Sequence, residues 1–157
     1  MKILVTSLIL TIGLCVAAQN GDSPALVNLK TGKTIDVKHF GPLKCGSKSM
    51  LMDNYIIIRG KYMDIMTEIT KYHDVEKIVP VDFKADPVTS VGNEKAIIRI
   101  YKKNGVAVSL EEAEFALSCY GPEDKYNTIV VQILNPLTNK VNEMTINVNE
   151  ISSIIFK

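Results

Sequence analysis

The sequence has little of the material from which enzymes and nucleic-acid-binding proteins are usually built. It contains no tryptophan, only two histidines and three cysteines among 157 residues, and aromatic residues make up 6%. Histidine is the side chain that most often carries acid–base chemistry near neutral pH. The 18 basic and 17 acidic side chains give a formal net charge of +1, so the chain has no electrostatic footprint for nucleic acid or for an anionic membrane. We therefore expect a protein that is not an enzyme, needs no cofactor and binds no nucleic acid.

Catalytic and ligand-binding motifs are also missing. The sequence contains no phosphate-binding loop, dinucleotide fingerprint or calcium loop, and neither histidine lies in a recognisable serine-hydrolase motif. His39 and His73 have the side-chain type to join Cys45 and Cys119 in a zinc site. No two of these four residues have the close spacing by which zinc sites are recognised, so we predict no metal site and no catalytic residue.

The first 18 residues have the pattern of a secretory signal peptide. Met1 and Lys2 form a short basic start, and residues 3–18 follow without a charge. This run is shorter than the roughly 20 residues that a helix needs to cross a bilayer. Small side chains up to Ala18, and the polar stretch after it, are typical of a cleavage site. We expect export to the periplasm or the exterior and no transmembrane helix after cleavage; an uncleaved N-terminal anchor is the alternative.

Most of the remaining chain alternates apolar and polar residues, which is the spacing of β-strands rather than of helices. Turn residues interrupt two of these alternating stretches, at 30–33 and at 102–105. The second turn contains Asn104 and Gly105, a pair that favours the positive φ angles of a tight hairpin. The pattern predicts a mostly β, antiparallel fold.

The two halves of this region resemble each other in the order of their strands and turns, which predicts an internal duplication. The clearest match is between residues 74–79 and 150–155, which share one acidic, one apolar, two polar and two further apolar positions. The other correspondences that we draw are Gly32 with Gly105, Val27 and Leu29 with Ile98 and Ile100, and Ile35 and Val37 with Val108 and Leu110. A single β-sandwich whose hairpins look alike is the alternative.

Each half resembles the SH3-like small β-barrel. The resemblance rests on an apolar strand, a turn of the Lys-Thr-Gly-Lys-Thr type, a second strand and two further strands. A short turn then precedes the last strand, and its pattern is Val75-x-x-Ile78 in one half and Ile151-x-x-Ile154 in the other. We expect all four of these apolar residues to be buried.

The resemblance implies two similar small antiparallel β-barrel or sandwich units, at residues 25–83 and 96–157. Residues 84–95 between them contain proline, glycine and asparagine without an apolar period. Such residues are typical of turns and irregular segments, so we predict a linker there.

Residues 110–119 fit the strand pattern less clearly. Ser109 and Glu112 match a capping box, in which each side chain satisfies a free backbone N–H at the start of a helix. We therefore predict a short helix near 110–119 that ends before the following Gly-Pro pair. The alternative is a strand that continues through Ala113 and Phe115 after a bulge.

Cys45 and Cys119 are the two cysteines that remain after signal cleavage. An even pair in an oxidising compartment is more often a disulfide than a metal site. Each cysteine follows the turn glycine of its half, Gly32 or Gly105, at a similar separation. Equivalent loops can meet where two similar units pack, so we predict a disulfide between Cys45 and Cys119; two unrelated thiols are the alternative.

Two further clusters have both a structural and a functional interpretation. The four methionines of residues 50–66 resemble a hydrophobic docking surface or a site for a soft metal such as Cu(I). Methionine more often fills irregular gaps in a core, and we expect core positions for these residues. The glutamates of residues 111–114 resemble an acid–base pair, but charged residues at this spacing usually form a solvated face, which is what we expect here.

These observations favour a non-catalytic exported protein that acts as an interaction or structural module of the cell envelope or exterior. Its partner would be another envelope or extracellular protein, bound through a groove or an exposed sheet edge. A binder of a small ligand, sugar or lipid, in the crevice between the units is the second hypothesis. A hydrolase without a recognisable motif is the third. An apolar pocket would favour the second hypothesis, and a cleft with titratable groups in contact would favour the third.

Overall fold

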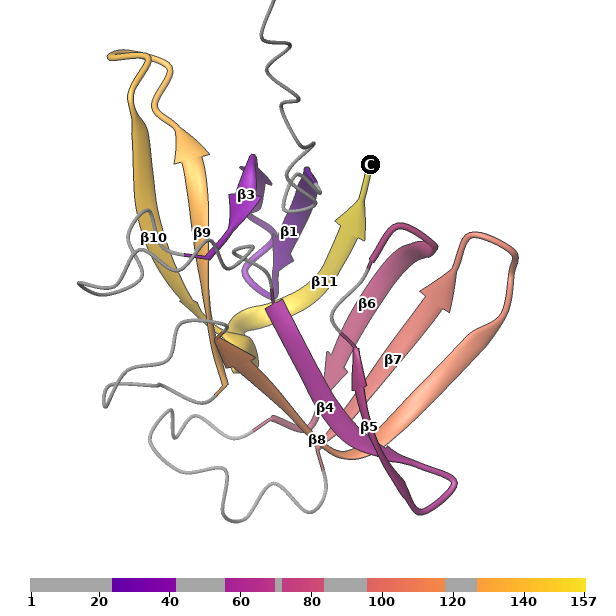
Figure 1. Cartoon of the computed structure of the whole chain (residues 1–157). Coiled ribbons are helices and arrows are strands. Elements are labelled where there is room, and N and C mark those ends of the chain that lie inside the picture. Colours follow the sequence, from indigo (N-terminus) through magenta and orange to yellow (C-terminus); the bar gives the residue numbers. More distant parts are fainter. Residues whose placement is uncertain (1–23, 42–55, 70–71, 84–95, 118–126) are drawn as a thin grey trace, which may run out of the picture.

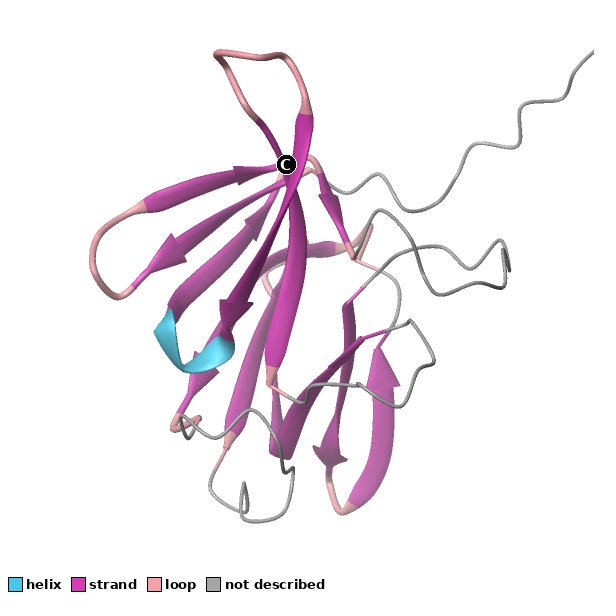
Figure 2. Ribbon diagram, turned by 90° about the vertical axis from the view of Figure 1, so that its left-hand side faces the viewer, coloured by secondary structure: helices cyan, strands magenta, loops and turns pink. Residues whose placement is uncertain are grey.

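The computed structural model describes residues 24–41, 56–69, 72–83, 96–117 and 127–157. The regular structure in these ranges is almost entirely β-strand (Figure 1). The one helical element among them is a three-residue 3-10 turn, η1, at Val148–Glu150 (Figure 2). All strand pairs in these ranges are antiparallel, so the predicted mostly β, antiparallel fold is confirmed. No helix in the described part of the chain is long and apolar enough to cross a membrane.

The strands are, in chain order, β1 Ala25–Leu29, β2 Thr34–Val37, β3 His39–Phe40, β4 Ile56–Tyr62, β5 Ile65–Ile69, β6 Val75–Val81, β7 Ile97–Lys102, β8 Ala107–Leu117, β9 Thr128–Leu134, β10 Val141–Asn147 and β11 Ile151–Phe156. Eight of them form one sheet in the order β2-β1-β11-β6-β7-β8-β4-β5, and three form a second sheet in the order β10-β9-β3. Between β2 and β3, the backbone N–H of Lys38 donates to the carbonyl oxygen of Gln132 in β9 at 2.9 Å. This hydrogen bond links the segment after β2 to the second sheet, and we call the two sheets together the ribbon, with β10 at one end of this strand order and β5 at the other.

The centre of this ribbon is the pair formed by β6 and β11, in which Ile78 and Ile154 lie opposite each other. Outward from this pair, both sides place their strands in the same order, with a first hairpin followed by a second one. The hairpins are β1–β2 and β9–β10 on one side and β7–β8 and β4–β5 on the other. The comparison of the two halves of the sequence also matches Ile78 with Ile154, the two residues that face each other at the centre.

The internal duplication stays a prediction, and the strand register aligns one part of the two halves differently from the apolar pattern. Val27 lies opposite Ile154, and Ile100 lies opposite Ile78. Counted from the central pair, Val27 therefore corresponds to Ile100, whereas the apolar pattern matched it with Ile98. A shift of two residues keeps the same face of a strand inward, so apolar spacing alone does not distinguish the two alignments.

Strand pairing crosses the boundary between the two halves of the sequence. The β1–β2 hairpin pairs with β11, and β3 pairs with β9. The β7–β8 hairpin lies between β6 and β4. Each half thus supplies its first hairpin to strands of the other half. The unit boundaries at 25–83 and 96–157 stay a prediction, and the predicted linker at 84–95 lies outside the described residues.

One apolar core runs through the ribbon and draws residues from both halves. Val75, Ile78, Ile151 and Ile154 are all buried, as predicted. The short turns in which the sequence pattern placed them are wrong, because Val75 and Ile78 lie within β6, and Ile151 and Ile154 lie within β11. The rings of Tyr72 and Phe156 stack with their centroids 5.2 Å apart, and those of Phe83 and Phe115 lie 5.7 Å apart. Both ring pairs join residues from opposite halves of the sequence, so the core couples the two halves.

The helix predicted near 110–119 is wrong. Ala107–Leu117 forms the 11-residue strand β8, which pairs with β7 along its first part and with β4 along its last part. Glu112, with φ at 46°, forms a bulge that shifts the alternation, so Leu110 and Ala113 are both buried. A helix of about ten residues is marginal on its own. Pairing with β7 and β4 provides backbone partners along most of this segment, which an isolated helix would lack.

Glycine is required on β4 where the bulge of β8 crosses it. A Cβ atom at Gly60 would lie 2.9 Å from the Cβ of Leu110 and 3.0 Å from the carbonyl oxygen of Glu111. Packed carbon atoms do not approach each other this closely, so a larger residue would push the strands apart. The close approach holds the β4–β5 hairpin against β8.

Candidate interaction site at the edge of the ribbon

The β4–β5 hairpin forms one end of the ribbon and is closed by a two-residue turn (Figure 1). Met63 and Asp64 in this turn both have positive φ angles, 50° and 63°. This is the backbone geometry of a type I′ turn, which asparagine and glycine normally occupy. Methionine adopts it at a cost because its Cβ crowds the backbone. The stability of the hairpin therefore does not explain why methionine occupies position 63.

The tip of this hairpin exposes large apolar side chains. The exposed fraction is 78% for Met63, 69% for Ile65, 66% for Met66 and 44% for Tyr62. We call these four residues the apolar tip. Single exposed apolar residues are ordinary, but a contiguous group of them marks contact surfaces.

The prediction that the methionines of residues 50–66 occupy core positions is wrong for the two that belong to the apolar tip. Met63 lies in the turn itself, and Met66 lies opposite Lys61, on the face that points away from the core. Met50 and Met52 lie outside the described residues.

β5 is also an edge strand, since among the described strands it pairs only with β4. Tyr62 and Ile65 flank the turn, and the flanking pair of a two-residue hairpin exchanges hydrogen bonds. Hydrogen bonding alternates along an antiparallel pair, so the backbone N–H and C=O groups of Met66 and Glu68 point away from β4. β5 contains neither proline nor lysine, the residues with which natural edge strands block further pairing.

Ion pairs cover the outward face of β4 beside this edge. Arg59 Nε lies 2.7 Å from a carboxylate oxygen of Glu68, and Arg59 Nη1 lies 3.8 Å from Glu114. Lys61 Nζ lies 2.7 Å from Glu112, across the bulge of β8. These partly exposed pairs are worth little individually, but they fix where the charges of this face lie.

The surroundings of Lys61 are acidic. The hydrogen bond to Glu112 raises the pKa of Lys61, and the negative charges of Asp64 and Glu111 raise it further. Residues 56–69 and 107–117 together contain five acidic and two basic side chains, a formal net charge of −3. The glutamates of residues 111–114, expected to form a solvated face, contribute three of the five acids.

The other end of the ribbon, formed by the β9–β10 hairpin, has a different charge. Leu137 is 93% exposed there, and Leu134 and Val141 are exposed beside it. Residues 34–41 and 127–147 contain two acidic and two basic side chains, so this end is formally neutral. Both ends therefore expose apolar side chains, but only the β5 end combines them with negative charge.

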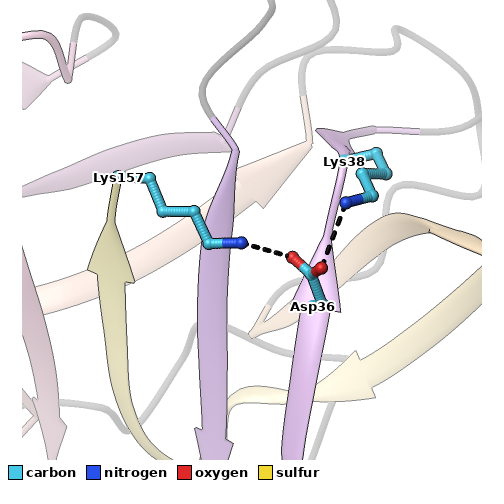
Figure 3. Close-up of polar contacts among 3 residues, drawn as sticks. All are labelled: Asp36, Lys38 and Lys157. Carbon is cyan, nitrogen blue, oxygen red and sulfur yellow. Dashed lines mark hydrogen bonds and ion pairs between the residues drawn. The ribbon is translucent and has the colours of Figure 1, made fainter.

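A separate ion-pair group lies on β2. Asp36 accepts hydrogen bonds from Lys157 at 2.7 Å and from Lys38 at 3.0 Å (Figure 3). These hydrogen bonds, that from Lys157 first, hold the pKa of Asp36 below its ordinary value. All three side chains are exposed, so solvent screens the attraction. The group ties the last residue of the chain to β2, and we assign it a structural role.

The residues considered for zinc are only partly described. His39 lies in β3, and His73 is exposed just before β6. Cys45 and Cys119 lie outside the described residues, and so does the disulfide predicted between them. Across the described ranges, no group of three His, Cys, Asp or Glu side chains is arranged to hold a metal ion.

Comparison with known proteins assigns no family to the chain. No protein-family model, curated protein or solved structure matches it. The fold and the site therefore define its class on their own: a mostly β protein of antiparallel sheets with an apolar tip beside an edge strand.

Proposed function

We propose that the protein is a non-catalytic interaction module that binds another protein through the edge of β5 and the apolar tip. The observation that carries this proposal is the coincidence, on one hairpin, of outward-pointing backbone groups with four exposed apolar side chains. A partner strand added to β5 would pair with the backbone of Met66 and Glu68 and cover the apolar tip. Burial of apolar surface and formation of backbone hydrogen bonds both favour such a complex.

The conformation of Met63 supports a binding role. A methionine at φ 50° is strained relative to glycine, and its side chain is the most exposed of the apolar tip. Local strain that brings no benefit to the fold is expected where a residue serves a contact. A large flexible thioether side chain is also well suited to adapt to a partner surface.

Export is the second part of the proposal. The pattern of residues 1–18 supports a cleaved signal peptide, so the partner would be another envelope or extracellular protein. The Cys45–Cys119 disulfide belongs to the same hypothesis, because an oxidising compartment lets such a bond persist. Mass spectrometry of the protein as its cells produce it tests both: we expect a chain that begins at Gln19 and lacks the two thiol hydrogens.

We further propose that the chain consists of two SH3-like units that exchange their first hairpins. The identical order of strands on the two sides of the β6–β11 pair supports this arrangement, as does the pairing of Ile78 with Ile154. In it, β1–β2 completes a unit with β9, β10 and β11, and β7–β8 completes a unit with β4, β5 and β6.

Site-specific photo-crosslinking in the cells that produce the protein tests the docking site. A photoreactive amino acid at position 63 should give a discrete adduct, and this adduct should be lost in Met66→Pro. The proline removes a backbone N–H that points outward and so leaves the bonds between β4 and β5 in place. Position 137, at the tip of the β9–β10 hairpin, is the matched control and should not give this adduct. An adduct at 63 that Met66→Pro does not weaken, or none at all, would refute the proposal.

A further inference from the structure

We infer that the segment that pairs with β5 is cationic as well as apolar: an extended stretch in which lysine or arginine alternates with apolar residues. This inference rests on the function proposed above and names the chemistry of the partner. It follows from the alternation of side chains along β5 and from the charge of the face beside it.

The alternation of side chains determines what a partner strand meets on each face. Ile65 and Ile69 lie on the inward face of β5, and Ile69 packs against the core. Met66 and Glu68 lie on the outward face, opposite Lys61 and Arg59 of β4. In a strand added to β5, every second side chain lies beside Ile65 and Ile69, and the others lie beside Met66 and Glu68. The first set is favoured when it is apolar.

The second set is favoured when it is positively charged. The outward face of β4, β5 and β8 carries the ion pairs of Arg59 and Lys61 together with an excess of carboxylates, and the net charge of these segments is −3. Glu111 and Asp64 add their negative charge around Lys61. A lysine or arginine opposite Glu68 gains from this excess, whereas a carboxylate there is repelled.

The β10 end of the ribbon provides a contrast within the same molecule. β10 is also an edge strand among the described residues, and Leu137 is exposed at its hairpin. Its surroundings are formally neutral, so they do not distinguish between cationic and anionic partners. The preference for a cationic strand is therefore expected only at β5.

Binding of synthetic peptides to the mature protein tests this inference. The probes are labelled peptides of about eight residues that alternate valine with lysine, with glutamate or with serine, and binding is measured by fluorescence anisotropy. We expect the Val-Lys peptide to bind at least about tenfold more tightly than the Val-Glu peptide. Its affinity should fall between about 50 and 200 mM salt, because salt screens exposed charges.

Substitutions test separately how much the acidic side chains and the backbone groups of β5 contribute to peptide binding. Glu68→Gln combined with Glu111→Gln should bring the affinity for the Val-Lys peptide close to that for the Val-Ser peptide. Met66→Pro should weaken binding of the Val-Lys peptide at least about tenfold. Thr145→Pro is the matched control, because Thr145 has the corresponding outward-pointing position on β10 and should leave binding unchanged. Met63→Gly, which keeps the backbone pairing, should weaken all three peptides alike.

The outcomes distinguish the inference from the proposed function. Equal binding of the three peptides, all lost in Met66→Pro, would overturn the cationic preference and leave the docking edge in place. Binding that Met66→Pro does not weaken would overturn both. If no peptide binds but the crosslink at position 63 persists, the inference that the partner segment is extended and alternates lysine or arginine with apolar residues is wrong. The urea midpoint of each variant shows whether it folds. If Met66→Pro does not fold, a Val-Lys peptide with methylated backbone nitrogens replaces it as the test of the edge: it cannot pair with β5 and should bind at least about tenfold more weakly than the unmethylated peptide.

Discussion

Truncation of Ile154 should destabilise the whole protein, because this residue lies at the centre of the ribbon. Ile154 is fully buried and lies opposite Val27 of β1 on one side and Ile78 of β6 on the other. Ile154→Ala removes about three methylene equivalents, and at roughly 0.8 kcal/mol for each the lost transfer free energy is about 2.4 kcal/mol. The cavity adds to this loss, because strands paired on both sides cannot close in on it. We expect a total of about 3–4 kcal/mol, inside the usual range of about 2–5 kcal/mol for such truncations.

Urea denaturation followed by circular dichroism measures this change in the free energy of unfolding. The wild-type protein should unfold in a single transition, because one core joins both halves. Ile78→Ala should cost nearly as much as Ile154→Ala, since the two residues face each other. Ile155→Ala is the matched control: Ile155 is half-buried on the outward face of the same strand, so its truncation should cost less than about 1.5 kcal/mol.

Two results would refute this reasoning. A loss below about 1 kcal/mol for Ile154→Ala, or one no larger than that of Ile155→Ala, would mean that the centre of the ribbon is not tightly packed. Two separate unfolding transitions in the wild-type protein would mean that the halves do not share one cooperative core.

Three further substitutions test individual features. Gly60→Ala should lower the free energy of unfolding by about 1–3 kcal/mol, because the added Cβ would lie 2.9 Å from Leu110; an unchanged urea midpoint would mean that β8 does not pass so close. Met63→Gly should raise the free energy of unfolding by up to about 1 kcal/mol, because glycine adopts φ 50° without crowding; a lower urea midpoint would contradict the strain assigned to Met63. The pKa of Asp36 is lowered in the folded state, so its ion pairs stabilise the protein above the ordinary carboxyl range and this contribution is lost as the pH falls through the lowered pKa. Asp36→Asn should therefore reduce the loss of stability as the pH falls below the ordinary carboxyl range, and urea midpoints that fall as steeply as in the wild type would argue against these ion pairs.

Much of the strand content and of the core could be predicted from the sequence. Gly32 and Gly105, taken as turn residues, have φ angles of 86° and 84°, which glycine adopts readily. The repeated pattern of an apolar residue three positions before Ile78 and Ile154 also identified these two residues as buried.

The segment near 110–119 shows why local signals sometimes fail. The capping box of Ser109 and Glu112 describes what a helix would gain at its first turn. It contains no information on whether β4 and β7 lie on either side of the segment. The segment forms a strand because it pairs with both β7 and β4. The bulge at Glu112 keeps the side chains of Leu110 and Ala113 buried.

The candidate site could be predicted only in part. A Met-Asp turn between two apolar strands is an unusual choice where Asn-Gly is common, and this signal for Met63 is visible in the sequence. We nevertheless expected a core position for this residue, because methionine often fills irregular gaps in a core. Exposure of the apolar tip depends on β5 lying at the end of the ribbon, which no local pattern specifies.

The sequence by itself determined the local features of this protein: where most strands run, where the hairpins turn and which faces of the strands are apolar. Only the tertiary structure decided which strands are neighbours. Asn28 of β1 donates a hydrogen bond to Ser153 of β11, 125 residues away, and the strand order brings the first hairpin of each half beside strands of the other. The physical reason is that backbone hydrogen bonds are alike in every strand, so partners are selected by the packing of the whole core. That selection leaves β5 and β10 at the two ends of the strand order among the described residues, and so places the apolar tip at an edge.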